Sequence, residues 1–229
     1  MDPYISIIIP AHNEEKYILH TLDSLKEQSY PHFETIVVTN GCTDKTEELI
    51  KKQGSLVHLS LPIPNVSRAR NHGAAKAKGS ILLFLDADTK LEKDALQKVA
   101  TSFTKEFAVG TTKVLPDEKK IRYNLAMKFK NLYTKTKLYK GCSGVLICQR
   151  DIFDKVNGYD SNLHVKEQRK LIEKMCEHGK YTCINTYAIT SMRRFKEWGL
   201  TKATLFWVKQ WMYDKIGRDI RKVEYEKVR

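Results

Sequence analysis

The chain has 229 residues, of which 41% are hydrophobic and 29% are charged, and its formal net charge at pH 7 is +13. These proportions are those of a folded globular protein and exclude a disordered, fibrous or low-complexity chain. The excess of Lys and Arg predicts an anionic partner, which nucleic acid, a phosphorylated substrate or an acidic membrane surface would satisfy. A surface made basic only for solubility is the alternative.

The cysteines and the first residues indicate where the protein works. There are five cysteines without a Cys-x-x-Cys pair. An odd number cannot all be bridged, which predicts reduced thiols in a cytoplasmic protein and argues against a cysteine metal site. The chain begins without the basic and apolar regions of a signal peptide. The longest strongly apolar run covers residues 81–85, so no membrane-spanning helix is expected.

The first half of the chain alternates predicted strands and helices. Strands are expected at residues 6–10, 33–39, 57–61 and 81–85. Helices are expected over residues 14–28, from residue 44 onward, and over residues 67–78. Asp44 and Glu47 suit a capping box, and Ser67 suits the cap of the third helix. This alternation predicts a parallel sheet with a ligand crevice at the carboxyl ends of its strands.

The second half has a different pattern. A lysine-rich segment over residues 113–140 is expected to be helical, with apolar residues on one face: Ile121, Leu125, Phe129 and Leu132. Further elements are expected as a strand at residues 140–150, a turn at 157–160, a helix at 171–178, a strand at 181–190 and a helix from residue 193 onward. No linker divides the chain, so we expect a single domain over residues 1–229.

Two carboxylates follow the fourth predicted strand. Asp86 and Asp88 are separated by Ala87, so an extended backbone points both side chains the same way. Oxygen ligands of this kind suit Mg²⁺ or Mn²⁺, and Mg²⁺ commonly takes one or two carboxylates together with substrate phosphates. An acidic turn that caps the helix after Leu91 is an equally good explanation of the pattern alone.

Four segments, in this order and spacing, resemble the inverting family 2 glycosyltransferases of the GT-A fold. The segments are residues 6–15, 37–46, 67–74 and the residues around Asp86. The resemblance implies an α/β fold with a Rossmann-like nucleotide-binding half, a mixed, mainly parallel central sheet flanked by helices, and C-terminal helices. It divides the chain into a nucleotide-sugar half (1–112), an acceptor half (113–192) and a C-terminal helical segment (193–229). It also implies a metal-dependent enzyme that takes a sugar from a UDP- or GDP-linked donor.

The resemblance assigns roles to individual residues of the donor site. The residues that would shape the nucleoside pocket are Pro10, Ala11, Asn13 and Glu14. Asn40 matches the position that reads the base, and Arg68 matches a basic position that meets the base or the diphosphate. Asp88 would bind the metal directly, whereas Asp86 would contact the ribose or share the metal.

Matches in the second half concern the sugar and the diphosphate. Residues 140–144 are similar to the strand that lines the donor-sugar pocket, where Ser143 and Gly144 let a sugar approach the backbone. Residues 191–195 are similar to a segment whose arginine holds the diphosphate. A guanidinium fork fits phosphate, so Arg194, with Arg193 beside it, is the predicted ligand.

One position departs from the family pattern. Many relatives have Glu-Asp, with Asp as catalytic base, where this chain has Glu167 and Gln168. Glutamine cannot accept a proton at neutral pH, so either Glu167 is the base or none is needed. A phosphate acceptor is already ionised and needs no base. The substitution therefore favours a polyprenyl or dolichyl phosphate over the alternative, a sugar or small-molecule hydroxyl.

The C-terminal residues bear on the same question. Residues 190–229 contain eleven Lys or Arg against five acids, together with all three tryptophans. This composition is typical of a helix that contacts anionic headgroups, here at the cytoplasmic membrane face. Core packing of the tryptophans is the alternative.

Two other functional classes are compatible with parts of the sequence. Nucleotidylyl transfer shares the fold and the metal but usually needs a Gly-rich loop, and residues 11–15 occupy that place. Nucleic-acid binding is suggested by charge alone, without a recognisable motif, so no nucleic-acid partner is expected.

Overall fold

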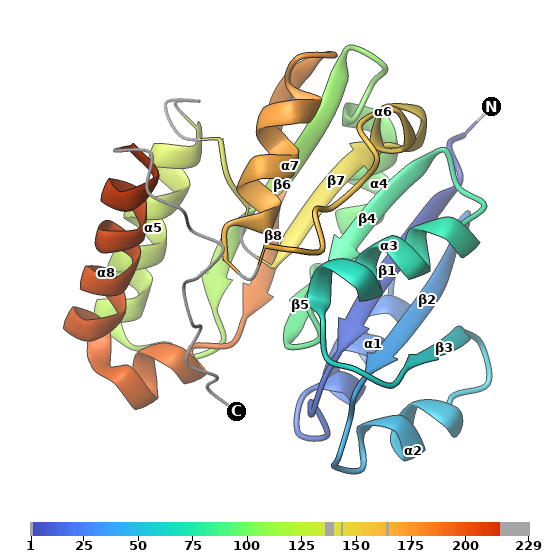
Figure 1. Ribbon diagram of the computed structural model, residues 1–229, viewed down its shortest axis with the longest axis horizontal. Helices are drawn as coiled ribbons and strands as arrows, with labels where there is room; N and C mark the ends of the chain where they lie inside the picture. The colour runs from blue at the N-terminus through green and yellow to red at the C-terminus, as the bar shows by residue number, and fades with distance from the viewer. Residues whose placement is uncertain (1, 136–139, 143, 164, 216–229) are drawn as a thin grey trace.

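The computed structural model describes residues 2–135, 140–142, 144–163 and 165–215, which form an eight-stranded sheet with helices against it (Figure 1). The strands are β1 (Ile5–Ala11), β2 (Phe33–Asn40), β3 (Val57–Leu61), β4 (Ile81–Leu85), β5 (Thr89–Leu91), β6 (Phe107–Pro116), β7 (Val145–Gln149) and β8 (Lys180–Thr190). The helices are α1 (Ile18–Lys26), α2 (Thr46–Lys51), α3 (Val66–Lys76), α4 (Ala95–Ser102), α5 (Ile121–Lys135), α6 (Arg150–Lys155), α7 (Glu167–Met175) and α8 (Arg193–Lys215).

The sheet has the strand order β3-β2-β1-β4-β7-β6-β8-β5. The first four strands run parallel, as the sequence predicted. β7 is antiparallel to both β4 and β6, β8 is parallel to β6, and β5 is antiparallel to β8. The predicted mixed α/β sheet flanked by helices is therefore confirmed.

β1 lies at the centre of the parallel half and is buried on both of its faces. Ile7 and Ile9 belong to a core shared with α1 and α4, whereas Ile8 packs in a second core with α3 and α7. Successive side chains of a strand point to opposite faces, so a continuous apolar run satisfies both cores. The carboxyl ends of β1 and β4 meet at one edge, where polar side chains follow.

The predicted starts of α1 and α3 were wrong, the first because of a tertiary hydrogen bond and the second because a different residue caps the helix. α1 begins at Ile18 rather than at Glu14, whose backbone N–H donates to Thr46 Oγ1 (2.7 Å). α3 is capped by Asn65 rather than by Ser67. The Asn65 side chain accepts a hydrogen bond from the Arg68 backbone N–H (2.9 Å), and Ser67 is buried inside the helix.

Other predicted boundaries also moved. Asp44 accepts from the Thr46 backbone N–H (3.0 Å) as expected, but Glu47 pairs with Lys51 (2.8 Å), so the capping box is not formed. Residues 113–116, expected as helix, belong to β6 because they pair with β8. Four elements, β5, β6, α4 and α6, were not predicted, and α7 and β7 begin at Glu167 and Val145 rather than at residues 171 and 140. No helix in the described ranges is long and apolar enough to cross a membrane.

Candidate active site

The residues after β4 are held firmly at the edge of the sheet. The Asp86 backbone N–H donates to the Gly144 carbonyl (2.8 Å), and the Ala87 carbonyl accepts from Thr21 Oγ1 (2.8 Å). The Thr89 backbone N–H donates to the Asp86 carbonyl (3.0 Å). These bonds join the β4–β5 turn to α1 and to the start of β7, so the two carboxylates have fixed positions.

Asp88 lies in a cluster with Glu14 and Arg193. The Arg193 guanidinium binds both oxygens of Glu14 (2.7 Å each) and lies 3.1 Å from Asp88 Oδ2. The Asp88 side chain is only 15% exposed. Burial raises its pKa to about 6, against the opposing charge of Arg193. A carboxylate in this position gains from additional positive charge.

A second cluster joins Asp86 to Glu167 through Arg70, which the sequence analysis did not single out. Arg70 donates to Asp86 Oδ1 and to Glu167 Oε1, at 2.9 Å each, and its side chain is 4% exposed. Its guanidinium also lies over the Tyr159 ring, 5.1 Å from the centroid. Arg70 therefore connects α3, the end of β4 and the start of α7, and its single positive charge is shared by two carboxylates.

The signal that could have found Arg70 is the helical spacing of α3. Ala69, Arg70, Gly73 and Ala74 are all buried, whereas Arg68 is exposed. Residues three or four positions apart lie on the same face of a helix, so the small residues Gly73 and Ala74 indicate that Arg70 faces the sheet. A buried guanidinium requires anionic partners.

Two predicted nucleoside-pocket asparagines make structural hydrogen bonds. The buried Asn40 amide donates to the Ala11 carbonyl (3.0 Å) and accepts from the Asn65 backbone N–H (2.8 Å). Asn13 exchanges two hydrogen bonds with Thr43, at 3.0 and 2.8 Å. Together with Pro10 at the end of β1, they shape the loops that surround the carboxyl edge of the sheet.

The family model for Glycosyl transferase family 2 matches residues 6–155.

This chain belongs to that family.

Curated relatives of this family 2 chain include the putative teichuronic acid biosynthesis glycosyltransferase TuaG of Bacillus subtilis, 35% identical over 101 residues (42% of this chain, 40% of TuaG). The poly(ribitol-phosphate) beta-N-acetylglucosaminyltransferase TarS of Staphylococcus aureus is 32% identical over 102 residues (42% of this chain, 18% of TarS). The alignments thus span less than half the length of these relatives.

Solved structures show the same fold. S. aureus TarS 1–349 in complex with UDP-GlcNAc has a TM-score of 0.67 and 20% identity, over 83% of this chain and 59% of that one. The mannosyltransferase PcManGT from Pyrobaculum calidifontis in complex with GDP-Man and Mn²⁺ has a TM-score of 0.67 and 19% identity, over 82% and 57%. The predicted GT-A fold of this family 2 chain is therefore confirmed.

The two adjacent arginines of the family 2 chain have different surroundings. Arg193 contacts the acids described above, whereas the Arg194 guanidinium lies over the Trp198 ring, 5.6 Å from the centroid. The sequence favoured Arg194 as the diphosphate ligand, and the structure brings Arg193 to Asp88 instead. Gln168 accepts a hydrogen bond from Cys142 Sγ (2.7 Å), which places α7 next to the predicted donor-sugar strand.

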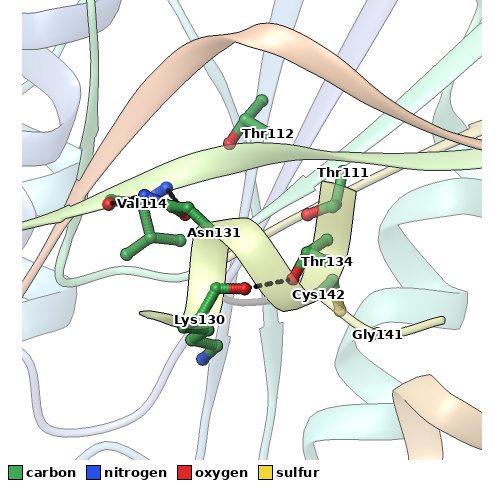
Figure 2. A pocket seen from close by; sticks show the side chains of 8 residues that line it. All are labelled: Thr111, Thr112, Val114, Lys130, Asn131, Thr134, Gly141 and Cys142. Carbon is green, nitrogen blue, oxygen red and sulfur yellow. Dashed lines mark hydrogen bonds between the residues drawn. The ribbon is translucent and has the colours of Figure 1, made fainter. Parts of the chain in front are cut away.

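A small pocket lies beside Gly141 and Cys142, which precede β7, between β6 and α5 (Figure 2). Its lining residues are Thr111, Thr112, Val114, Lys130, Asn131, Thr134, Gly141 and Cys142. Its volume of about 10 Å³ has room for one water molecule and not for a sugar. The buried Thr112 hydroxyl, which has no hydrogen-bond partner among the described residues, is a suitable ligand for that water.

The carboxylates of Asp86 and Asp88 are chemically suitable ligands for a divalent cation. In the part of the chain that the structure describes, however, no three His, Cys, Asp or Glu side chains are grouped to hold one. Asp88 and Asp86 would supply two hard oxygen ligands, and phosphates and water commonly complete such a site. The Asp88 carboxylate is buried, has a raised pKa and lies near Glu14 and Asp86. It is therefore the ligand whose charged form a bound cation would stabilise most.

Gly144 is the predicted donor-pocket residue with the tightest surroundings; Ser143 lies outside the described residues. Gly144 has φ +73°, and an added Cβ would lie 2.6 Å from Thr89 Oγ1. We expect Gly144→Ala to lower the free energy of unfolding by about 2 kcal/mol, because the left-handed backbone alone costs about 1–2 kcal/mol. Urea unfolding measures this. Gly54→Ala, which meets nothing within 4 Å, is the control, and equal stability of the two variants would contradict the expectation.

Proposed function

We propose that the chain is an inverting glycosyltransferase that takes a sugar from a UDP- or GDP-linked donor. The observation that carries the proposal is the Asp88–Glu14–Arg193 cluster at the carboxyl edge of the sheet, where α/β folds bind their ligands. Family membership supports sugar transfer over nucleotidylyl transfer. The TarS and PcManGT structures, which are complexes with UDP-GlcNAc and GDP-Man, support a nucleotide-sugar donor.

The site residues would divide the work as follows. Pro10, Ala11, Asn13 and Asn40 surround the nucleoside, and Arg68 meets the base or the diphosphate. Mg²⁺ or Mn²⁺ on Asp88, with Asp86 near the ribose, would neutralise charge on the diphosphate.

Arg193, and not only the predicted Arg194, would add positive charge beside the leaving group, because its guanidinium lies 3.1 Å from Asp88 Oδ2. The acceptor oxygen attacks the anomeric carbon from the face opposite the diphosphate. A new carbon–oxygen bond forms as the bond to the nucleoside diphosphate breaks, and the configuration is inverted.

The proposed acceptor is a lipid phosphate, a polyprenyl or dolichyl phosphate at the cytoplasmic membrane face. Gln168 replaces the family's base, and Glu167 is bound by Arg70, which fixes the carboxylate as a neighbour of Asp86. An acceptor that is already ionised reacts without a base. The alternative is a sugar or small-molecule hydroxyl in glycan synthesis, which the names of TuaG and TarS favour.

Replacing Glu167 by glutamine separates the two acceptors. For a phosphate acceptor we expect turnover to fall by no more than about tenfold, because no proton is removed. For a hydroxyl acceptor the loss would be about a hundredfold to ten-thousandfold, the usual contribution of a positioned base. The measurement is steady-state turnover with each acceptor. Glu173→Gln, an exposed change on the same helix, is the matched control, and a thousandfold loss in Glu167→Gln alone would refute the base-free reaction.

A further inference from the structure

Helix α5 presents an apolar stripe to solvent. The stripe consists of Ile121 (87% exposed), Leu125 (67%), Phe129 (72%) and Leu132 (61%). Their spacing of four, four and three residues places them on one side of the helix. Single exposed apolar residues are ordinary, whereas a contiguous group of four large ones marks a contact surface.

The stripe is not needed by the protein core. The opposite side of α5 carries Tyr123 and Met127, which are buried against Val114 of β6 and Met192. The helix therefore has two apolar faces, one packed and one open. What covers the open face must come from outside the described fold.

The charges around the stripe indicate what that partner is. Successive residues of a helix are turned by about 100°, so the exposed Arg122 and Lys128 lie on opposite flanks of the stripe. Lys119 and Lys120 are exposed just before the helix, and α5 contains no acidic residue. The nearby Glu118 is already paired with Lys120 and Lys196. An apolar surface between cations is complementary to an apolar surface between anions.

We propose that this face of α5 docks on a membrane surface that contains anionic lipids. Leu125 and Phe129 would enter the boundary between headgroups and acyl chains, and Arg122 and Lys128 would meet the phosphates. A second copy of the chain is a poorer partner, because the cations of two such helices would face each other. The net charge of +13 adds to this repulsion.

The docked helix would be coupled to the proposed active site. The Tyr123 ring lies 6.3 Å from the ring of Phe195, two residues beyond Arg193. Asp117, shortly before α5, accepts from the Met192 backbone N–H (3.0 Å). Figure 1 shows α5 and α8 together at the end of the molecule away from β3. Docking would therefore bring the acceptor half to the headgroups, a consequence that rests on the proposed function. The docking itself is independent of the proposed function.

Vesicle flotation of the full chain tests the proposal. We expect binding to phosphatidylcholine vesicles that contain phosphatidylglycerol, and at least tenfold weaker binding of the double variant Leu125→Ser/Phe129→Ser, since about 1.4 kcal/mol of lost apolar burial suffices. Arg122→Glu/Lys128→Glu should bind more weakly too, and added salt should weaken the wild type. Ile63→Ser, which removes an apolar side chain of similar exposure (65%) elsewhere, should bind like the wild type.

Separate readouts keep the outcomes distinct. Unchanged thermal unfolding and unchanged nucleotide binding in the double variant would show that only docking is lost. If the proposed function failed, the wild type would not bind nucleotide, but vesicle binding would still test the docking. Vesicle binding that is absent in the wild type, or equal in the double variant, would overturn the proposal. A wild-type dimer in light scattering that is absent in the double variant would also overturn the proposal, because the stripe would then contact a second copy of the chain.

Discussion

Replacing Arg70 by methionine is expected to lower the free energy of unfolding by about 3 kcal/mol and to remove most of the transferase activity. The guanidinium is buried and forms ion pairs with Asp86 and Glu167 at 2.9 Å each. Removing one partner of a buried ion pair leaves the other charge without compensation, which costs about 3–5 kcal/mol. The lower end applies here because Asp86 is 38% exposed and retains contact with water.

Urea unfolding and initial rates measure the two effects. Arg68→Met is the control for stability, because Arg68 lies on the same helix with an exposed side chain, and it should change the free energy of unfolding by less than about 0.5 kcal/mol. Arg70→Lys should rescue only part of the loss, since an ammonium cannot hold both carboxylates in the fork geometry. An Arg70→Met protein as stable as Arg68→Met would show that this cluster is not important for the fold.

The position of Asp86 and Asp88 in the fold was predictable because its signal is local. Residues 81–85 form a continuous apolar run, which marks a strand buried on both faces. Asp86 and Asp88 follow it directly and therefore lie at the carboxyl edge. The parallel order of the first four strands follows from the alternation of strands and helices.

Arg70 and Arg193 could not be assigned in the same way, because their partners are distant in sequence. Arg70 meets residues 16 and 97 positions away, and Arg193 meets Glu14 at a separation of 179. Whether Arg193 or Arg194 faces the acids depends on where α8 begins, and hydrophobic periodicity does not define that residue. The start of α1 was misplaced for a similar reason, since a tertiary hydrogen bond between Glu14 and Thr46 replaces the expected first turn.

Helix α5 shows a further limit of periodic patterns. Ile121, Leu125, Phe129 and Leu132 correctly predicted a helix, yet they are exposed, and Tyr123 and Met127 form the buried side. When both sides of a helix carry apolar residues, spacing identifies the helix but not its packed face. The lipid contact predicted for residues 193–229 stays a prediction, because residues 216–229 lie outside the described part.

Asp88→Asn is expected to reduce sugar transfer by about a thousandfold with little effect on folding. The substitution keeps the shape of the side chain and removes the charge that would hold a divalent cation, which contributes several kcal/mol to neutralising a leaving group. Arg193 keeps both contacts with Glu14 in this variant, so no buried arginine is left without a partner. Asp94→Asn, which changes a surface acid paired with Lys98, is the matched control and should retain full activity.

Isothermal titration calorimetry with UDP- and GDP-sugars, with and without Mn²⁺, tests the central claim most directly. The account predicts that one of the two nucleotides binds the wild type and Asp94→Asn in the presence of Mn²⁺. It predicts much weaker binding without the metal or in Asp88→Asn. Absence of binding to either nucleotide-sugar, or equal affinity in Asp88→Asn with and without Mn²⁺, would contradict a metal-assisted donor site at Asp88.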